Sequence, residues 1–185
     1  MEKQRCLWAN NAPELYKKYH DEEWGVSVHD DHKLFEMLVL ESFQAGLSWL
    51  TILKKRENFR KAFDNFDVRK VAQYDEEKIA ELTSNKSIIR NSLKIKATIK
   101  NAQVYIAIQE EFGSFSTYLW NFTNNKSIPL SEEGLTHSAL SDKISKDLYN
   151  RGMRFVGSVI IYAYLEAVGV LHNHARNCFL YHKKD

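Results

Sequence analysis

The segment from Ser145 to Leu165 reads S-K-D-L-Y-N-R-G-M-R-F-V-G-S-V-I-I-Y-A-Y-L and predicts two helices joined by a tight turn. Gly152 and Gly157 mark the turn. The second helix, Val159 to Val168, is apolar on every side, which is typical of a buried helix. Gly157 stands where this helix begins, so free backbone N–H groups would point outward there. A helix start of this kind suits a phosphate group.

Two interpretations of this helix pair are compatible with the pattern. Lys146, Arg151 and Arg154 lie close to the turn and supply positive charge, as in a helix-hairpin-helix that holds the DNA backbone without reading sequence. The alternative is a plain corner between two helices, which is common in helical proteins. The pattern alone leaves both open.

The rest of the chain is also helical in its periodicity, with only two prolines and seven glycines to interrupt it. Acidic N-caps predict short helices that begin at Asp67 and Asp75. Longer helices are predicted over Lys33 to Glu41, Leu47 to Phe63, Asn91 to Phe112 and Ser141 to Asn150. A short aromatic helix is predicted over Ser116 to Phe122, and a loop over Asn124 to Thr136. We therefore expect an all-α fold, one compact multi-helix domain over residues 1–185, with the hairpin at about 141–168.

Composition narrows the class of protein. Hydrophobic residues make up 44% of the 185 residues, which is enough for a sizeable core, and a net charge of +2 neither requires nor excludes a polyanionic partner. The N-terminal residues lack the apolar stretch of a signal peptide, and no long apolar run predicts a membrane span. Two cysteines do not form a disulfide framework, so we expect a cytoplasmic protein with reduced thiols.

The stretch E-S-F-Q-A-G-L-S-W, Glu41 to Trp49, places a carboxylate directly after a run of apolar residues. A carboxylate in such surroundings is costly unless it is paired or used. Together with Gln44 and Trp49, Glu41 would suit a planar nitrogenous ligand that carries N–H donors or positive charge. The alternative is that Glu41 merely ends a helix and faces water.

Two further clusters near the N-terminus have competing interpretations. The aromatic residues of the first cluster lack a helical stripe and would wall either a cleft or a small satellite core; they are Trp8, Tyr16, Tyr19 and Trp24. The second cluster, H-D-D-H at His29 to His32, resembles a metal-dependent phosphohydrolase motif only superficially, because adjacent helical residues point to different faces. We interpret His29 to His32 as an exposed helix start.

Each end of the chain carries one cysteine with a histidine within reach. His174 and Cys178 are spaced to meet on one helical turn, and Cys6 and His20 would supply a second pair of ligands for a closed zinc site. His172 competes with His174 for the role. Spacing alone does not separate a metal site from an accidental H-x-x-x-C.

Several motifs occur in an order that resembles a known family. They are C-x-W from Cys6, Y-H-D-E-E-W-G-V from Tyr19, L-F-E-M-L-V-L-E up to Glu41, Q-A-G-L-S-W-L-T-I-L-K-K-R-E from Gln44, F-V-G-S from Phe155, and H-x-x-x-C up to Cys178. Together they resemble the type I 3-methyladenine DNA glycosylases over nearly the whole chain. This family belongs to the helix-hairpin-helix glycosylase superfamily and carries a structural zinc.

The resemblance implies roles for individual residues. Glu41 matches the catalytic carboxylate that contacts the base, and Cys6, His20, His174 and Cys178 match the zinc ligands. The positions that match base-binding residues are Tyr19, Trp49, Tyr16, Trp8, Trp24 and Gln44. The positions that match the hairpin, and hence the DNA backbone contacts, are Arg151, Gly152, Arg154, Phe155, Gly157 and Ser158.

The implied activity is flipping and hydrolytic excision of 3-methyladenine from alkylated double-stranded DNA by a monomer. The superfamily's usual catalytic aspartate is missing from V-L-H-N-H-A-R-N-C, residues 170–178, which fits a substrate that leaves without being protonated. Two other classes stay open: a non-enzymatic helix-hairpin-helix module that only binds DNA, and a protein that binds or acts on free alkylated purines.

Overall fold

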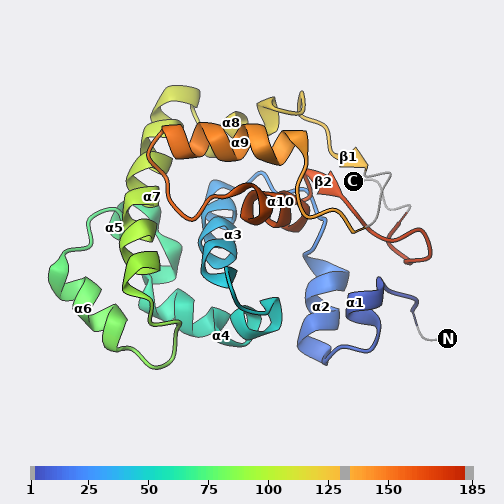
Figure 1. The fold of residues 1–185 in the computed structure, drawn as a ribbon, viewed down its shortest axis with the longest axis horizontal. Helices are drawn as coiled ribbons and strands as arrows, with labels where there is room; N and C mark the ends of the chain where they lie inside the picture. The colour runs from blue at the N-terminus through green and yellow to red at the C-terminus, as the bar shows by residue number, and fades with distance from the viewer. Residues whose placement is uncertain (1–2, 130–133, 182–185) are drawn as a thin grey trace.

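The computed structural model describes residues 3–129 and 134–181, and these fold into ten α-helices with one 3₁₀ turn and two very short strands (Figure 1). In chain order the elements are α1 (Leu7–Asn10), α2 (Glu14–Glu22), α3 (Asp31–Gln44), α4 (Trp49–Ala62), η1 (Asp64–Phe66), α5 (Val68–Val71), α6 (Glu76–Ser84), α7 (Ser92–Phe112), α8 (Phe115–Asn121), β1 (Ile128–Pro129), α9 (Ala139–Asn150), α10 (Ser158–Ala167) and β2 (Leu171–His172). The predicted helical fold is confirmed, and its long helices end within three residues of the predicted positions.

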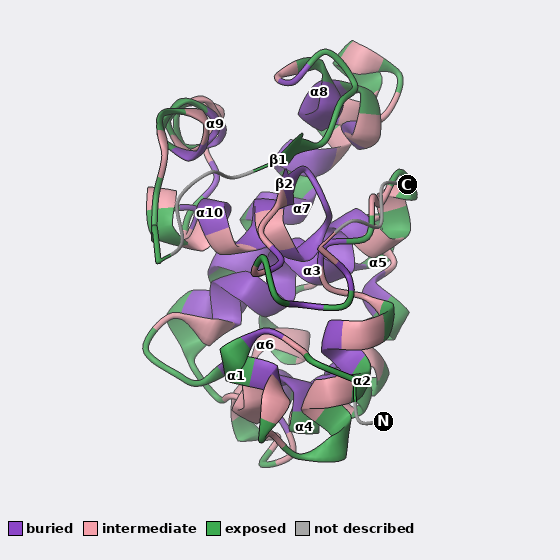
Figure 2. Cartoon of the chain, turned by 90° about the vertical axis from the view of Figure 1, so that its right-hand side faces the viewer, coloured by how far each residue is buried: buried purple, intermediate pink, exposed green. Residues whose placement is uncertain are grey.

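Helix α3 lies at the centre of the fold, where α10, α7, α4 and α8 contact it (Figures 1 and 2). Ten consecutive residues of α3, from Leu34 to Phe43, are buried, among them Glu36 and Glu41. A helix that is apolar on all sides is stable in water only when other helices cover it, so the sequence of α3 dictates its central place. Glu41 is therefore buried on the central helix, and the alternative that it faces water is wrong.

Side-chain caps fix where most helices begin. The carboxylates of Asp67 and Asp75 accept backbone N–H groups of the first turns of α5 and α6, as predicted. Asp30 caps α3 in the same way, and Asp31 of the same H-D-D-H stretch accepts the N–H groups of Phe115 and Ser116 at 2.8 Å, which caps α8. The interpretation of His29 to His32 as a helix start is confirmed.

The polar segment from Asn124 to Thr136 departs in part from the predicted loop. Residues Ile128 and Pro129 pair in parallel with Leu171 and His172, so the chain is not purely α-helical. Residues 130–133 of this segment lie outside the described residues. The two-residue pairing attaches the segment to the C-terminal stretch through the hydrogen bond from Ile128 N to the carbonyl of Val170, 2.9 Å long.

The turn between α9 and α10 is held firmly against the centre of the fold. Gly152 has φ +108°, a conformation that favours glycine, and a Cβ there would approach side chains of α7. Asn101 of α7 bonds the backbone of Arg154 twice, once as donor and once as acceptor, both at 2.8 Å. Ser42 of α3 donates to the carbonyl of Phe155. The helix pair is therefore fixed relative to the helix that carries Glu41.

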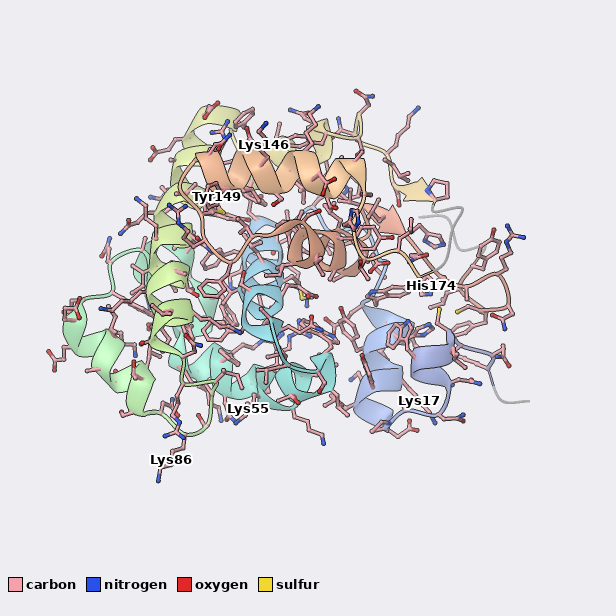
Figure 3. The ribbon with its side chains drawn as sticks, in the orientation of Figure 1. Lys17, Lys55, Lys86, Lys146, Tyr149 and His174 are labelled. Carbon is pink, nitrogen blue, oxygen red and sulfur yellow. The ribbon has the colours of Figure 1, made fainter. Side chains whose placement is uncertain are left out.

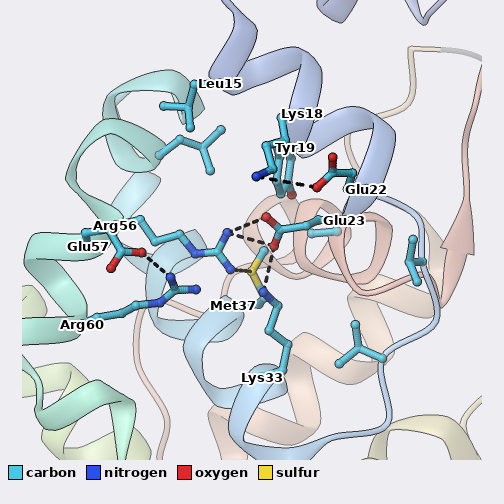
Figure 4. Close-up of a pocket in the computed structure, with 14 residues that line it drawn as sticks. Leu15, Lys18, Tyr19, Glu22, Glu23, Lys33, Met37, Arg56, Glu57 and Arg60 are labelled. Carbon is cyan, nitrogen blue, oxygen red and sulfur yellow. Dashed lines mark hydrogen bonds and ion pairs between the residues drawn. The ribbon is translucent and has the colours of Figure 1, made fainter.

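An ion-pair network ties α2 to α3 and α4. Arg56 pairs with the buried Glu36 at an N–O distance of 2.7 Å. It also pairs with Glu23 at 2.9 Å, and Lys33 reaches Glu23 at 2.8 Å (Figure 4). Because Glu23 follows directly on α2, the network fixes the helix that carries Tyr19.

Among the described residues, no helix combines the length and apolar character needed to cross a bilayer.

Candidate active site and metal centre

A cavity of about 210 Å³ opens where α1, α2, α3, α4 and α10 meet, and Glu41 lies on its wall. Every residue predicted to contact the base lines it. The lining consists of Trp8, Tyr16, Tyr19, Trp24, Glu41, Gln44, Trp49, Ala163 and Glu166. The aromatic residues of the N-terminal segment therefore wall a cleft, and Trp8 is the most exposed of them at 37%.

Glu41 is unusual for a buried carboxylate because one of its oxygens, Oε2, has no hydrogen-bond partner among the described residues. Burial, and to a smaller extent the nearby charge of Glu166, raise the pKa of Glu41 to about 8. The indole N–H of Trp49, on the same cavity, is likewise buried without a partner. Buried polar groups left unpaired cost free energy, so this pair of atoms is suited to a ligand.

The aromatic walls form two sets of ring contacts. Trp8 packs edge-on against Trp24 with ring centroids 5.1 Å apart, and Trp8 lies 4.9 Å from Tyr16. Tyr19 and Trp49 form the second set, with ring centroids 5.4 Å apart. Burial, and then the charge of Glu41, keep the pKa of Tyr19 well above its ordinary value, so its hydroxyl stays a hydrogen-bond donor. Flat walls with a donor and an acceptor suit a heterocyclic base.

Ala163 and Glu166 of α10 line the cavity and were not predicted from the sequence. Glu166 follows the apolar run of α10 as Glu41 follows that of α3, so the same signal was available for it. Burial raises the pKa of Glu166 to about 7, against the opposite effect of a hydrogen bond from Asn173. Two carboxyl groups from different helices therefore face one cavity.

A second cavity of about 530 Å³ lies between α2 and α4 and shares Tyr19 with the first (Figure 4). Its charged lining is largely consumed by ion pairs, including Arg60 with Glu57 and Arg56 with Glu23. Those side chains satisfy one another, in contrast to Glu41. The smaller cavity is therefore the better candidate for a ligand site.

The four residues predicted as metal ligands come together beside α1 and α2, where Figure 3 shows His174. Their donor atoms all lie within 4.8 Å of one another, and all four residues are buried; they are Cys6, His20, His174 and Cys178. The Sγ atoms of Cys6 and Cys178 lie 3.6 Å from His174 Nδ1, and Cys178 Sγ lies 3.5 Å from His20 Nε2. A tetrahedral zinc with ordinary bond lengths separates sulfur and nitrogen ligands by about 3.6 Å. The donor set therefore fits zinc.

Outer hydrogen bonds orient these donors as metal ligands require. His174 Nε2 lies 3.2 Å from the carbonyl of Trp24, and His20 Nδ1 lies 2.9 Å from Asp21, whose carboxylate also pairs with Arg5. Backbone N–H groups donate to both sulfurs. Burial, and then His20, lower the pKa of His174 to about 4, which keeps the imidazole neutral. His172 stands outside the cluster, with Nε2 3.2 Å from the carbonyl of Tyr181.

The predicted DNA-backbone residues occupy the turn and the start of α10. Gly157 is exposed, and a Cβ built on it would meet nothing within 4 Å, so the N-terminus of α10 is open. Arg154 lies over the ring of Tyr149, 4.6 Å from its centroid, and no carboxylate of the described residues pairs with it. Arg151 instead pairs with Glu111 and Asp147, and Ser158 donates to Asp142. The carboxylates of Glu111, Asp147 and Asp142 would therefore compete with a phosphate for Arg151 and Ser158.

The cavity and the cysteine–histidine cluster belong to a fold that is already known in other proteins. The family model described as methyladenine glycosylase matches residues 8–181 of this sequence. This chain belongs to the methyladenine glycosylase family. The resemblance predicted from the sequence motifs is therefore confirmed.

Individual members of the family are similar over almost their whole length. DNA-3-methyladenine glycosylase 1 of Escherichia coli strain K12 is 44% identical over 183 residues, which are 96% of this chain and 97% of that protein. The structure of 3-methyladenine DNA glycosylase I from Staphylococcus aureus, which describes 3-methyladenine recognition, has 37% identity and a TM-score of 0.92, with 98% of both chains covered. A 3-methyladenine DNA glycosylase I variant in complex with 3-methyladenine has 36% identity and a TM-score of 0.92, covering 98% of this chain and 99% of that one.

Proposed function

We propose that this protein is a DNA glycosylase that flips 3-methyladenine out of alkylated double-stranded DNA and excises it by hydrolysis, leaving an abasic site. The observation that carries the proposal is the buried Glu41 on the wall of an aromatic cavity, whose Oε2 has no hydrogen-bond partner in the described part of the chain. The chain is also 44% identical to DNA-3-methyladenine glycosylase 1 of Escherichia coli. The 3-methyladenine complex of another family member supports the same ligand class.

The cavity suits an alkylated purine for reasons of charge and shape. Methylation at N3 makes the adenine of DNA cationic, and a cation is stabilised by a carboxylate and by the faces of aromatic rings. Trp49 would stack on the base, while Glu41 and Tyr19 would hydrogen-bond its edge. Binding a cation favours the ionised form of Glu41, so the raised pKa of the free protein is offset when the base enters.

The reaction needs little acid–base help. The C1′–N9 bond breaks and its electron pair passes to the base, which cancels the positive charge of the ring. The oxygen of a water molecule forms the new bond to C1′, and its proton passes to solvent. Extrusion of the nucleotide costs a few kcal/mol of unstacking, and contacts inside the pocket compensate for that cost. Trp8, Tyr16, Trp24 and Gln44 would complete the enclosure of the base.

The hairpin would hold the DNA backbone while the base enters the cavity. The open N-terminus of α10 offers backbone N–H groups to a phosphate, and Arg154 adds an unpaired positive charge. Gly152, Phe155 and Ser158 shape the turn, and Arg151 would have to exchange its carboxylate partners for a phosphate. Asn101 and Ser42 fix the distance between this turn and α3.

Cys6, His20, His174 and Cys178 would hold a structural zinc that joins the two ends of the chain. The zinc would stabilise the fold by linking the buried side chains that bind it, and it would take no part in the reaction. Trp24 packs edge-on against His174 at 4.7 Å, and Trp8 packs against His20 at 5.1 Å, so the clasp would support two walls of the cavity. We expect the protein to act as a monomer in the cytoplasm.

Methylated duplex DNA incubated with the protein, followed by mass spectrometry of the released bases, tests this function. Release of 3-methyladenine identifies the glycosylase. A module that only binds DNA would retain the duplex and release nothing. A binder of free purines would bind 3-methyladenine in solution and leave the duplex intact.

A further inference from the structure

Glu166 is a second carboxylate in the cavity that holds Glu41, and it comes from a different helix. Glu41 belongs to α3 and Glu166 to α10, and both line the same space of about 210 Å³. Glu41 Oε2 has no partner among the described residues, and no lysine or arginine of that part of the chain forms a salt bridge with Glu166. The cavity therefore holds two carboxyl groups that no lysine or arginine of the described residues pairs with.

The Glu166 carboxylate is held in place by the segment that carries His174 of the cysteine–histidine cluster. Asn173, which directly precedes His174, donates from Nδ2 to Glu166 Oε1 at 2.5 Å. The backbone carbonyl of Glu166 accepts the N–H of Gly25, next to the cavity wall formed by Trp24. One carboxylate oxygen is thus anchored by an amide, and the side chain has a defined place on the cavity wall.

Two carboxylates on one cavity treat charged and neutral ligands differently. When both are ionised they repel each other, and a cation placed between them removes this repulsion while a neutral base does not. A cavity of about 210 Å³ is roughly 7 Å across, and at an effective dielectric constant of about 20 one such charge changes cation affinity by about tenfold or more.

We propose that Glu166 is a specificity-determining residue that makes the site select cationic purines over neutral ones. The proposal rests on the function proposed above, because it assigns Glu166 to the same base-binding cavity. N3-methylated adenine would be attracted to each carboxyl group that ionises around it, whereas a neutral adenine would gain no such attraction. Discrimination against undamaged adenine would then depend on charge as well as on shape.

The test uses a substitution that removes only the charge. In Glu166→Gln the amide oxygen still accepts from Asn173, so the anchoring hydrogen bond is retained. Binding to the intact protein is measured by tryptophan fluorescence with two probes: 3,9-dimethyladeninium, which is permanently cationic, and 9-methyladenine, which is neutral. The matched control is Glu77→Gln on α6, which removes one exposed carboxylate outside the cavity.

Glu166→Gln should weaken binding of the cationic probe by about tenfold and leave binding of the neutral probe within about twofold, while Glu77→Gln changes neither. Equal losses for both probes, or no loss for either, would overturn the role of Glu166. Base release by the wild-type protein distinguishes a failure of this inference from a failure of the proposed function. If wild type releases 3-methyladenine from methylated duplex while Glu166→Gln keeps the full preference for the cationic over the neutral probe, only the inference fails. If it neither releases the base nor prefers the cation, both fail.

Discussion

Substitution of Glu41 by glutamine should stabilise the ligand-free protein, and should do so increasingly as the pH rises. The ordinary pKa of this carboxyl group is 4.5, and burial with the charge of Glu166 raises it to about 8 in the folded protein. Between these two values the folded state binds a proton that the unfolded state has lost. The free energy of unfolding therefore falls as the pH rises through this window.

The magnitude follows from the shift. A difference of about 3.5 pH units, at about 1.4 kcal/mol per unit, amounts to on the order of 5 kcal/mol above pH 8. Below about pH 5 the carboxyl group is protonated in the folded protein and costs little. Glutamine carries no charge at any pH. The free energy of unfolding of Glu41→Gln, minus that of wild type, should therefore rise by several kcal/mol between about pH 5 and pH 8.

The assay is urea unfolding of both proteins, followed by far-UV circular dichroism, at several pH values from about 4.5 to 9. Any constant cost of the buried amide cancels because only the change with pH is used. Glu77→Gln, which removes an exposed carboxylate from α6, should run parallel to wild type. A stability difference between Glu41→Gln and wild type that stays constant across this range would refute the buried, unpartnered state of Glu41.

Two other predictions concern the cysteine–histidine cluster and the turn between α9 and α10. Purified protein should contain one zinc per chain by elemental analysis. Removal of the zinc by a strong chelator should lower the melting temperature by more than about 10 °C, because structural zinc contributes on the order of 10 kcal/mol. Metal-free protein with an unchanged melting temperature would contradict the structural zinc site. Arg154→Ala should weaken binding to any duplex sequence and reduce the slope of log affinity against log salt by about one. Lys86→Ala removes the same charge from the edge of the molecule opposite α9 (Figure 3) and should leave the slope unchanged. Equal slopes for wild type and both variants would contradict DNA-backbone binding by the turn that carries Arg154.

Much of the fold could be predicted because helical periodicity and capping residues are local signals. Asp67, Asp75 and Gly113 mark helix ends by their own chemistry, and the structure places the ends there. The pairing of Ile128 with Leu171 escaped prediction because two residues are too few to show alternation. A contact between segments so distant in sequence also leaves no local pattern.

The candidate site could be predicted in part for the same reasons. Glu41 was identifiable because a carboxylate after an apolar run must be explained, whereas Glu166 was overlooked within a helix interpreted as uniformly apolar. The ion pair of Arg151 with Asp147 follows from their spacing of four residues, but its pair with Glu111 joins two helices and leaves no local pattern. Whether Cys6 and Cys178 meet is a property of the whole fold, because they lie at opposite ends of the chain.

The central claim is that the aromatic cavity around Glu41 excises an alkylated base, and base release from methylated duplex tests it most directly. Wild-type protein, Glu41→Gln and the control Glu77→Gln are incubated with the same DNA, and the free bases are identified by mass spectrometry. Wild type and the control should release 3-methyladenine at equal rates, and Glu41→Gln should release it at least about tenfold more slowly while remaining folded. Undiminished release by Glu41→Gln, or no 3-methyladenine from wild type, would contradict the account.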